Sequence, residues 1–203
     1  MYASQRSNKS PSVFVATKAA TAIPIAHELV RDALIQAALD PAVRAIEFIP
    51  TIAAYGEVIA LDVIVLRGDD GSQVLDIAET RPVRSLDDEA LALLAIDQLG
   101  LQTKTLSAVD IGRQPRAANS RLVWACRHYR VSAGDRVRVL QVLTEEGEMT
   151  LARAAAQCRF AVDAVAAVLA LVCADLIEAD LATLPLGPET RVRRRIVAGD
   201  SHG

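Results

Sequence analysis

The sequence predicts an α/β fold in which helices flank a mixed β-sheet, followed by a small, mostly helical part. Residues 23–111 alternate helical and strand patterns, two apolar runs in this segment flank a tight turn, and the pattern from about residue 112 onward is helical with one short strand signal. A helix, a strand hairpin and a crossover helix together favour a mixed sheet with helices on both faces.

The composition limits the class of protein. Of the 203 residues, 52% are apolar but only 3% are aromatic, so alanine, valine and leucine must fill the core. The formal charge of −3 identifies no partner by itself. The N-terminus has no apolar signal segment and the apolar runs are too short to cross a bilayer, so we expect a cytoplasmic protein without a membrane partner. Three widely spaced cysteines, Cys126, Cys158 and Cys173, argue against a disulfide framework or a zinc site.

The first predicted elements follow from proline and polar signals. Residues 1–20 are expected to form a flexible arm, because the beginning of the chain is rich in polar residues. Pro24 fits the first turn of a helix that ends at Asp40, before Pro41. Residues 43–49 are then predicted to form a strand that Pro50 closes.

A hairpin and a crossover helix complete a predicted domain over residues 21–112. Residues 58–66 and 73–78 read as two strands, and the Gly68-Asp69-Asp70-Gly71 turn makes them hairpin partners. Ser85 opens a helix that Gly100 ends, and residues 101–106 read as a fourth strand.

Carboxylates within the apolar strand segments point to a metal site. Burying Asp62, Asp76 or Glu79 in such a sheet costs several kcal/mol unless the charge is paired or holds a cation. Neighbouring strands lie about 5 Å apart, so these oxygens could converge on Mg²⁺. The alternative is an ordinary ion pair of Asp62 with Arg81 or Arg84.

These motifs, in this order, resemble the PD-(D/E)xK nuclease core, and residues 24–195 resemble the TnsA-type transposon endonucleases. The matching segments are AHELVRDAL with Glu28, VIALDVIVL with Asp62, QVLDIAETR, SLDDEALALLAIDQLGL and AANSRLVWACRHYR. The resemblance implies a restriction-endonuclease-like sheet, then a winged-helix-like domain over residues 113–203 with a basic linker and tail. It also implies metal-dependent cleavage of double-stranded DNA at transposon ends, with Mg²⁺ or Mn²⁺, inside a heteromeric transposase that contains a recombinase subunit.

The resemblance assigns roles to individual residues. It places Glu28, Asp62, Glu79 and Arg81 at catalytic positions, and Asp62, Asp76 and Glu79 at metal positions. Glu47, in the strand segment RAIEFI, is an alternative to Glu28.

The lysine expected two residues after the second acid is missing. If Asp76 is that acid, Ala78 occupies the lysine position, and if Glu79 is that acid, Arg81 occupies it. We prefer Glu79-Thr80-Arg81 slightly because it keeps a cation, although a guanidinium replaces a lysine poorly, and Asp76 stays open. A catalytically degraded nuclease fold that binds DNA or a transposase without cutting is therefore the second hypothesis.

A basic stretch without any acidic residue runs from residue 113 to 134. Phosphate backbones favour such a stretch, so we expect DNA contact from its arginines. They are Arg113, Arg116, Arg121, Arg127 and Arg130. The alternative is that they pair with acidic residues of the nuclease-like domain.

The last part has the helix and strand order of a winged-helix unit. Its longest apolar helix, in AVDAVAAVLALVCADL, is suited to a core and not to reading DNA, so a partner recombinase would supply target choice. Asn119 is expected to help open a helix, and RVRRR at 191–195 to form a basic tail.

Overall fold

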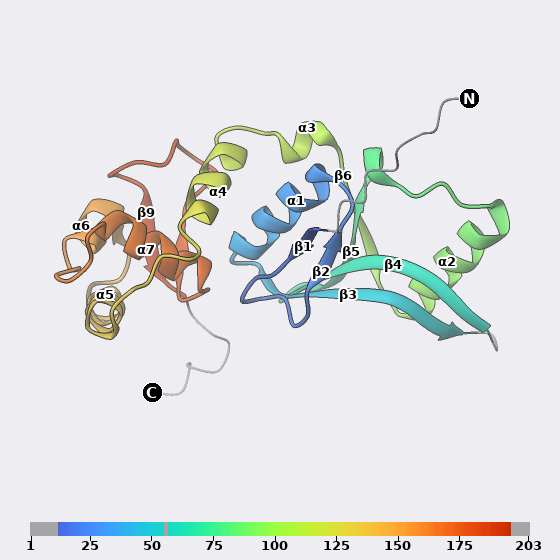
Figure 1. Cartoon of the computed structure of the whole chain (residues 1–203), viewed down its shortest axis with the longest axis horizontal. Helices are drawn as coiled ribbons and strands as arrows, with labels where there is room; N and C mark the ends of the chain where they lie inside the picture. Colours follow the sequence, from blue (N-terminus) through green and yellow to red (C-terminus); the bar gives the residue numbers. More distant parts are fainter. Residues whose placement is uncertain (1–11, 55–56, 196–203) are drawn as a thin grey trace, which may run out of the picture.

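The computed structural model describes residues 12–54 and 57–195. Its elements form two groups that lie next to one another: a four-stranded sheet with α1 and α2, and a second group that contains α4 to α7 (Figure 1). No helix within the described residues is long and apolar enough to cross a membrane.

The main sheet has the strand order β3-β4-β5-β6. Its strands are β3 (Val43–Ala54), β4 (Glu57–Gly68), β5 (Gly71–Ile77) and β6 (Gln102–Leu106). The first three are antiparallel neighbours, and β6 runs parallel to β5. Parallel strands need a crossover, which α2 (Leu86–Gln98) provides. The predicted mixed sheet is confirmed.

Helices flank the sheet, as expected. In the larger core cluster, α1 (Glu28–Leu39) packs with the β4 and β5 residues Leu66 and Leu75. In the smaller cluster, α2 packs with Ile59 and Leu61 of β4. Val63 packs in the smaller cluster and the next residue, Ile64, in the larger one. Neighbouring side chains of a strand point to opposite faces, so the two helices cover different faces of β4.

The hairpin turn occurs where the sequence predicts it. Gly68 and Gly71 are paired across the β4–β5 turn. A Cβ atom on Gly68 would lie 2.7 Å from the carbonyl oxygen of Ala42, so only glycine fits there. Arg44 donates to both carboxylate oxygens of Asp69, at 2.9 and 2.6 Å, and holds the turn against the start of β3.

Two predicted boundaries at prolines are wrong. Pro24 lies in the short strand β2 (Ile23–Ile25), and α1 begins later, at Glu28, with the His27 side chain accepting from the N–H of Leu29. Pro50 does not close β3 but lies within it. Since β3 is an edge strand, the missing N–H of Pro50 breaks no ladder between two inner strands.

The predicted flexible arm is also wrong for residues 12–20, whereas residues 1–11 lie outside the described residues. Strand β1 (Ser12–Phe14) pairs with β2. Phe14 is 3% exposed, and its ring stacks on that of Trp124 with centroids 5.2 Å apart. This segment therefore belongs to the core.

The second group contains more strands than predicted. Its elements are α4 (Arg116–Ala125), α5 (Ala133–Glu146), β7 (Met149–Thr150), α6 (Leu151–Ala155), α7 (Ala164–Cys173), β8 (Ile177–Ala179) and β9 (Arg191–Arg194). The strands form an antiparallel sheet of order β7-β9-β8. The expected basic tail is therefore the central strand of this sheet, with Val192 buried within it.

A single apolar core joins both groups. It includes Leu34 of α1, Val123 of α4, Val139 of α5 and Val168 of α7. Asn119 is expected from the sequence to help open a helix, but it lies buried within α4. Its side-chain amide donates to the carbonyls of Leu181 and Leu184 at 2.9 and 2.8 Å. It fixes the connection between β8 and β9 to α4.

Candidate functional site

Asp62 lies at a β-bulge in β4. Ile49 pairs with Val63 and Thr51 with Ala60, so Leu61 and Asp62 together face Pro50 alone. Asp62 has a φ of +49°, in the left-handed region that aspartate tolerates better than most residues. Its side chain is exposed, whereas Leu61 is fully buried. The expectation of a buried Asp62 is wrong, because residues 58 to 62 alternate between exposed and buried and Asp62 falls on the exposed side.

The bulge is stabilised by Arg84. Its guanidinium donates to the carbonyl oxygen of Leu61 at 2.6 Å and lies 3.6 Å from the carboxylate of Glu89. Arg84 thus binds the backbone next to Asp62 and not the Asp62 carboxylate.

Asp76, in β5, forms an ion pair with Arg81 and does not share a metal site with the other predicted acids. The Arg81 Nε and Nη2 atoms donate to the two carboxylate oxygens at 2.9 and 2.5 Å, and the Thr105 hydroxyl donates at 2.8 Å. The hydrogen bonds from Arg81 lower the pKa of the Asp76 carboxyl, against its partial burial and with help from Thr105. Asp76 therefore carries a charge that Arg81 already balances.

Glu79 lies beyond the strand. It is in the one-turn helix η1 (Ala78–Thr80), is exposed, and accepts from the N–H of Ala108 at 2.8 Å. That hydrogen bond fixes η1 to the start of α3 (Ala108–Ile111). Of the two candidates for the second acid, only Asp76 lies on the strand, and the residue two positions after it is Ala78.

The two candidates for the first acid differ in their contacts. Glu28 is the first residue of α1; its side chain is 80% exposed and lies 3.7 Å from Arg31. Glu47, in β3, accepts two hydrogen bonds of 2.7 Å from Arg67 on β4, which lower the pKa of its carboxyl. Glu47 thus forms a cross-strand ion pair, which leaves Glu28 as the better candidate.

The predicted metal ligands do not form a three-carboxylate site. Across residues 12–54 and 57–195, no group of three or more His, Cys, Asp or Glu side chains could hold a metal ion. Asp62, Asp76 and Glu79 therefore do not converge, and Asp76 and Glu79 are held by Arg81 and by a backbone N–H. These residues do not fit a Mg²⁺ or Mn²⁺ ion, which requires several free oxygen ligands.

Two of the predicted DNA-binding arginines pair with acids at α1: one with Asp32 within the helix and one with Asp40, its C-terminal cap. Arg116 donates to Asp40 at 2.9 Å, and Arg121 donates to the two Asp32 oxygens at 3.3 and 2.5 Å. Both arginines lie on α4, so these pairs fix α4 against α1. For Arg116 and Arg121 the structure therefore agrees with the alternative hypothesis, in which the arginines pair with acidic residues of the preceding domain.

The other three predicted arginines are more accessible. Arg113 is 75% exposed and lies 3.7 Å from Asp110. Arg127 lies over the Trp124 ring at 5.4 Å and donates to the Trp124 carbonyl at 3.1 Å. Arg130 is exposed in the α4–α5 connection.

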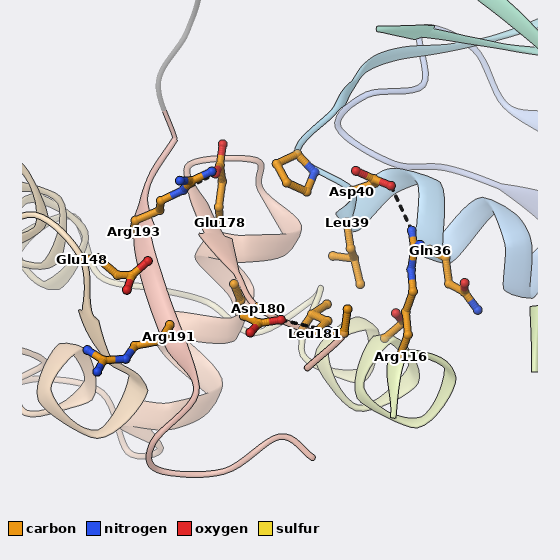
Figure 2. A pocket seen from close by; sticks show the side chains of 14 residues that line it. Gln36, Leu39, Asp40, Arg116, Glu148, Glu178, Asp180, Leu181, Arg191 and Arg193 are labelled. Atoms are coloured by element: carbon orange, nitrogen blue, oxygen red, sulfur yellow. Dashed lines mark hydrogen bonds and ion pairs between the residues drawn. The ribbon is translucent and has the colours of Figure 1, made fainter. Parts of the chain in front are cut away.

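Two pockets lie along α1, and the second is lined by Thr105, the hydroxyl donor to Asp76. One, of about 290 Å³, lies between the end of α1, α4 and the β8–β9 strands (Figure 2). Its charged side chains include the Arg116–Asp40 and Arg193–Glu178 pairs (Figure 2). The other, of about 340 Å³, lies between α1, the sheet and α3. Neither is lined by Glu28, Asp62, Asp76, Glu79 or Arg81.

Thr105 was not singled out from the sequence. It is the register partner of Asp76 in the parallel β5–β6 pair, which brings its hydroxyl to the carboxylate. The register of a parallel pair depends on the length and packing of the crossover α2, and no local signal around Thr105 encodes it.

The sequence matches no protein-family model, and a search of curated proteins finds no match either. The function proposed for this chain therefore rests on its sequence motifs and on the geometry of the fold and site.

Proposed function

We propose that this chain is a TnsA-like subunit of a heteromeric transposase that acts on double-stranded DNA at transposon ends, together with a recombinase subunit. The observation that carries the proposal is the order α1-β3-β4-β5-α2-β6, with three antiparallel strands and a parallel fourth. This order is the one implied by the nuclease-like motifs, and Asp62 and Asp76 lie on its two inner strands.

The second group of elements supports the same proposal. The order α5, β7, α6, α7, β8, β9 agrees with a winged-helix-like unit. In such a unit the last helix usually reads the DNA groove, but Ala167–Val172 of α7 are buried. Sequence choice would then come from the recombinase partner, and this subunit would contact DNA through charge.

The first candidate activity is endonucleolytic. Asp62 and Asp76 lie near the same end of the paired β4–β5 segment, because Ile64 is the register partner of Leu75. Asp62 has a positive φ at the bulge, and backbone in this sparsely populated region is frequently associated with functional sites. Metal-dependent phosphodiester cleavage is the activity that the resemblance implies for these acids.

The second candidate is a non-cleaving DNA- or transposase-binding subunit, and the Asp76–Arg81 pair favours it. Arg81 donates to both oxygens of Asp76, whose charge is then balanced without a metal. Ala78 supplies no cation at the lysine position. We therefore expect the chain to bind DNA without nicking it.

A nicking assay separates the two candidates. Purified protein is incubated with supercoiled plasmid and Mg²⁺ or Mn²⁺, beside the Asp62→Ala variant. We expect both proteins to convert supercoiled plasmid to open circles only at the background rate. Nicking by the wild type that Asp62→Ala abolishes would establish the endonuclease candidate and reject the non-cleaving one.

A further inference from the structure

Four arginines in the α4–α5 connection, in α5 and in the α6–α7 loop form no ion pair with any carboxylate of the described residues. They are Arg127, Arg130, Arg136 and Arg159, and all four are exposed. By contrast, Arg113, Arg116 and Arg121 each lie within 4.0 Å of an acid, at 3.7, 2.9 and 2.5 Å. Lys104, Arg191 and Arg194 are also exposed without an ion pair in the described part of the chain, but they lie on strands β6 and β9. The first four arginines, those of the α4–α5 connection, α5 and the α6–α7 loop, are here called the α5 basic surface.

Three contacts bring the segments of the α5 basic surface together. The N–H of Asp163 donates to the Tyr129 hydroxyl at 2.9 Å, which joins the α4–α5 connection to the α6–α7 loop. The N–H of Arg159 donates to Asp135 at 2.7 Å, which joins the same loop to α5. The Arg138 guanidinium lies 5.0 Å above the ring of Phe160, in the same loop.

The acids near this surface leave most of its positive charge in place. Asp135 is fully buried and paired with Arg138 at 2.6 Å. Asp163 accepts from the N–H of Ala166 at 2.9 Å, as the cap of α7. Phe160 is 70% exposed beside these arginines, and Arg127 lies on the Trp124 ring. Clustered exposed arginines are typical of surfaces that contact the phosphate backbone of nucleic acids.

We propose that the α5 basic surface, and not the row Arg113, Arg116 and Arg121, binds the phosphate backbone of double-stranded DNA. This inference rests on the proposed function and assigns DNA contact to a defined part of the chain. Arg116 and Arg121 would have to leave Asp40 and Asp32 to reach a phosphate, whereas the α5 basic surface needs no such rearrangement. A phosphate contact releases counterions, so it lowers the salt sensitivity of binding when it is removed.

Two triple variants with the same change of charge test the proposal. Binding of a short duplex DNA is measured by fluorescence anisotropy over a series of NaCl concentrations. In Arg130→Ala/Arg136→Ala/Arg159→Ala, we expect the negative slope of log K against log salt to become shallower by about 2 to 3. The affinity for DNA should fall about 100-fold at roughly 0.1 M salt. In Arg113→Ala/Arg116→Ala/Arg121→Ala, the slope should stay as in the wild type.

A lysine version of the first triple variant distinguishes lost contacts from lost folding. Arg130→Lys/Arg136→Lys/Arg159→Lys keeps the charges, so it should retain the wild-type slope. Equal slopes for the wild type and the first alanine triple, or an equal loss in both alanine triples, would overturn the proposed surface while leaving DNA binding intact. A wild type that binds no duplex even at low salt would overturn the proposed function as well.

Discussion

Asp135 is a fully buried carboxylate that holds the α6–α7 loop against α5. It accepts from the N–H groups of Arg159 and Phe160 at 2.7 and 3.1 Å and from Arg138 at 2.6 Å. Burial acts to raise the pKa of this carboxyl, but the hydrogen bonds from Arg159, Arg138, Ser132 and Phe160 outweigh it and lower the pKa to about 2. The folded protein therefore stabilises the ionised form of Asp135.

The acid stability of the chain should report on Asp135. Its folded pKa of about 2 lies below the ordinary value of about 3.9, so its contribution to stability is present above about pH 4 and is lost as the pH falls from 4 toward 2. Asp135→Asn should lower the melting temperature by several degrees at neutral pH, and the difference from the wild type should shrink toward pH 2. Melting curves measured over this pH range check it, and a constant difference would contradict it.

The sequence predicts that arginines contact the acidic region, but not which arginine contacts which acid. The sequence offers Arg81 and Arg84 as cations for Asp62, and both do contact this region. The structure pairs Arg81 with Asp76 and places Arg84 on the carbonyl of Leu61. The bulge at Asp62 and the end of β5 at Ile77 decide these pairings, and neither follows from residue types.

The helix α2 has apolar side chains on both its inner and its outer face. Ala92 and Ala95 are buried against β4, in one cluster with Ile59 and Leu61. On the outer face, Leu93 and Leu94 are 56% and 52% exposed. Only the inner face therefore contributes to the stability of the sheet, although the sequence gives both faces similar hydrophobicity.

Two leucine substitutions should show which face of α2 contributes to stability: Leu61, on β4, packs against its inner face, and Leu93 lies on its outer face. Leu61→Ala removes a fully buried side chain and should lower the free energy of unfolding by about 2–5 kcal/mol. Leu93→Ala, the matched control on the exposed face of α2, should change it by less than about 0.5 kcal/mol. Urea unfolding measures both. A large loss for Leu93→Ala would mean that another surface covers α2.

Elements with local signals could be predicted, and elements that depend on distant contacts could not. Ser85 accepts from the N–H of Asp88 and opens α2, as predicted, because a cap involves only its own turn. Thr150 opens α6 in the same way. Gly147 ends α5 with a φ of +78°. The predicted boundaries at Pro24 and Pro50 are wrong because an edge position in a sheet accepts proline, and edge positions are set by tertiary pairing. The same limit applied to the three-stranded sheet, whose strands are only 2 to 4 residues long.

Buried charges join the beginning and the end of the described chain to its centre. Arg195, with a side chain 4% exposed, pairs with Asp175 at 2.9 Å and donates to the carbonyls of Pro41 and Val43 at 3.1 Å each. Lys18, with a side chain 2% exposed, lies 3.2 Å from Asp175 and donates to the carbonyl of Asp40 at 2.6 Å. Asp175 follows α7, so these contacts tie the second group of elements to the connection between α1 and β3.

Removing Arg195 should therefore weaken the whole molecule and not only β9. Arg195→Ala leaves Asp175 facing Lys18 alone and leaves two backbone carbonyls without their donor, so we expect the free energy of unfolding to fall by about 3 kcal/mol. Arg191→Ala, at an exposed position of the preceding strand β9, is the control and should change the free energy of unfolding by less than about 0.5 kcal/mol. Because one core spans both groups, the loss in Arg195→Ala should appear as a single unfolding transition shifted to lower urea. Separate transitions for the two groups, or equal effects of the two variants, would show that the buried charges do not couple the two groups.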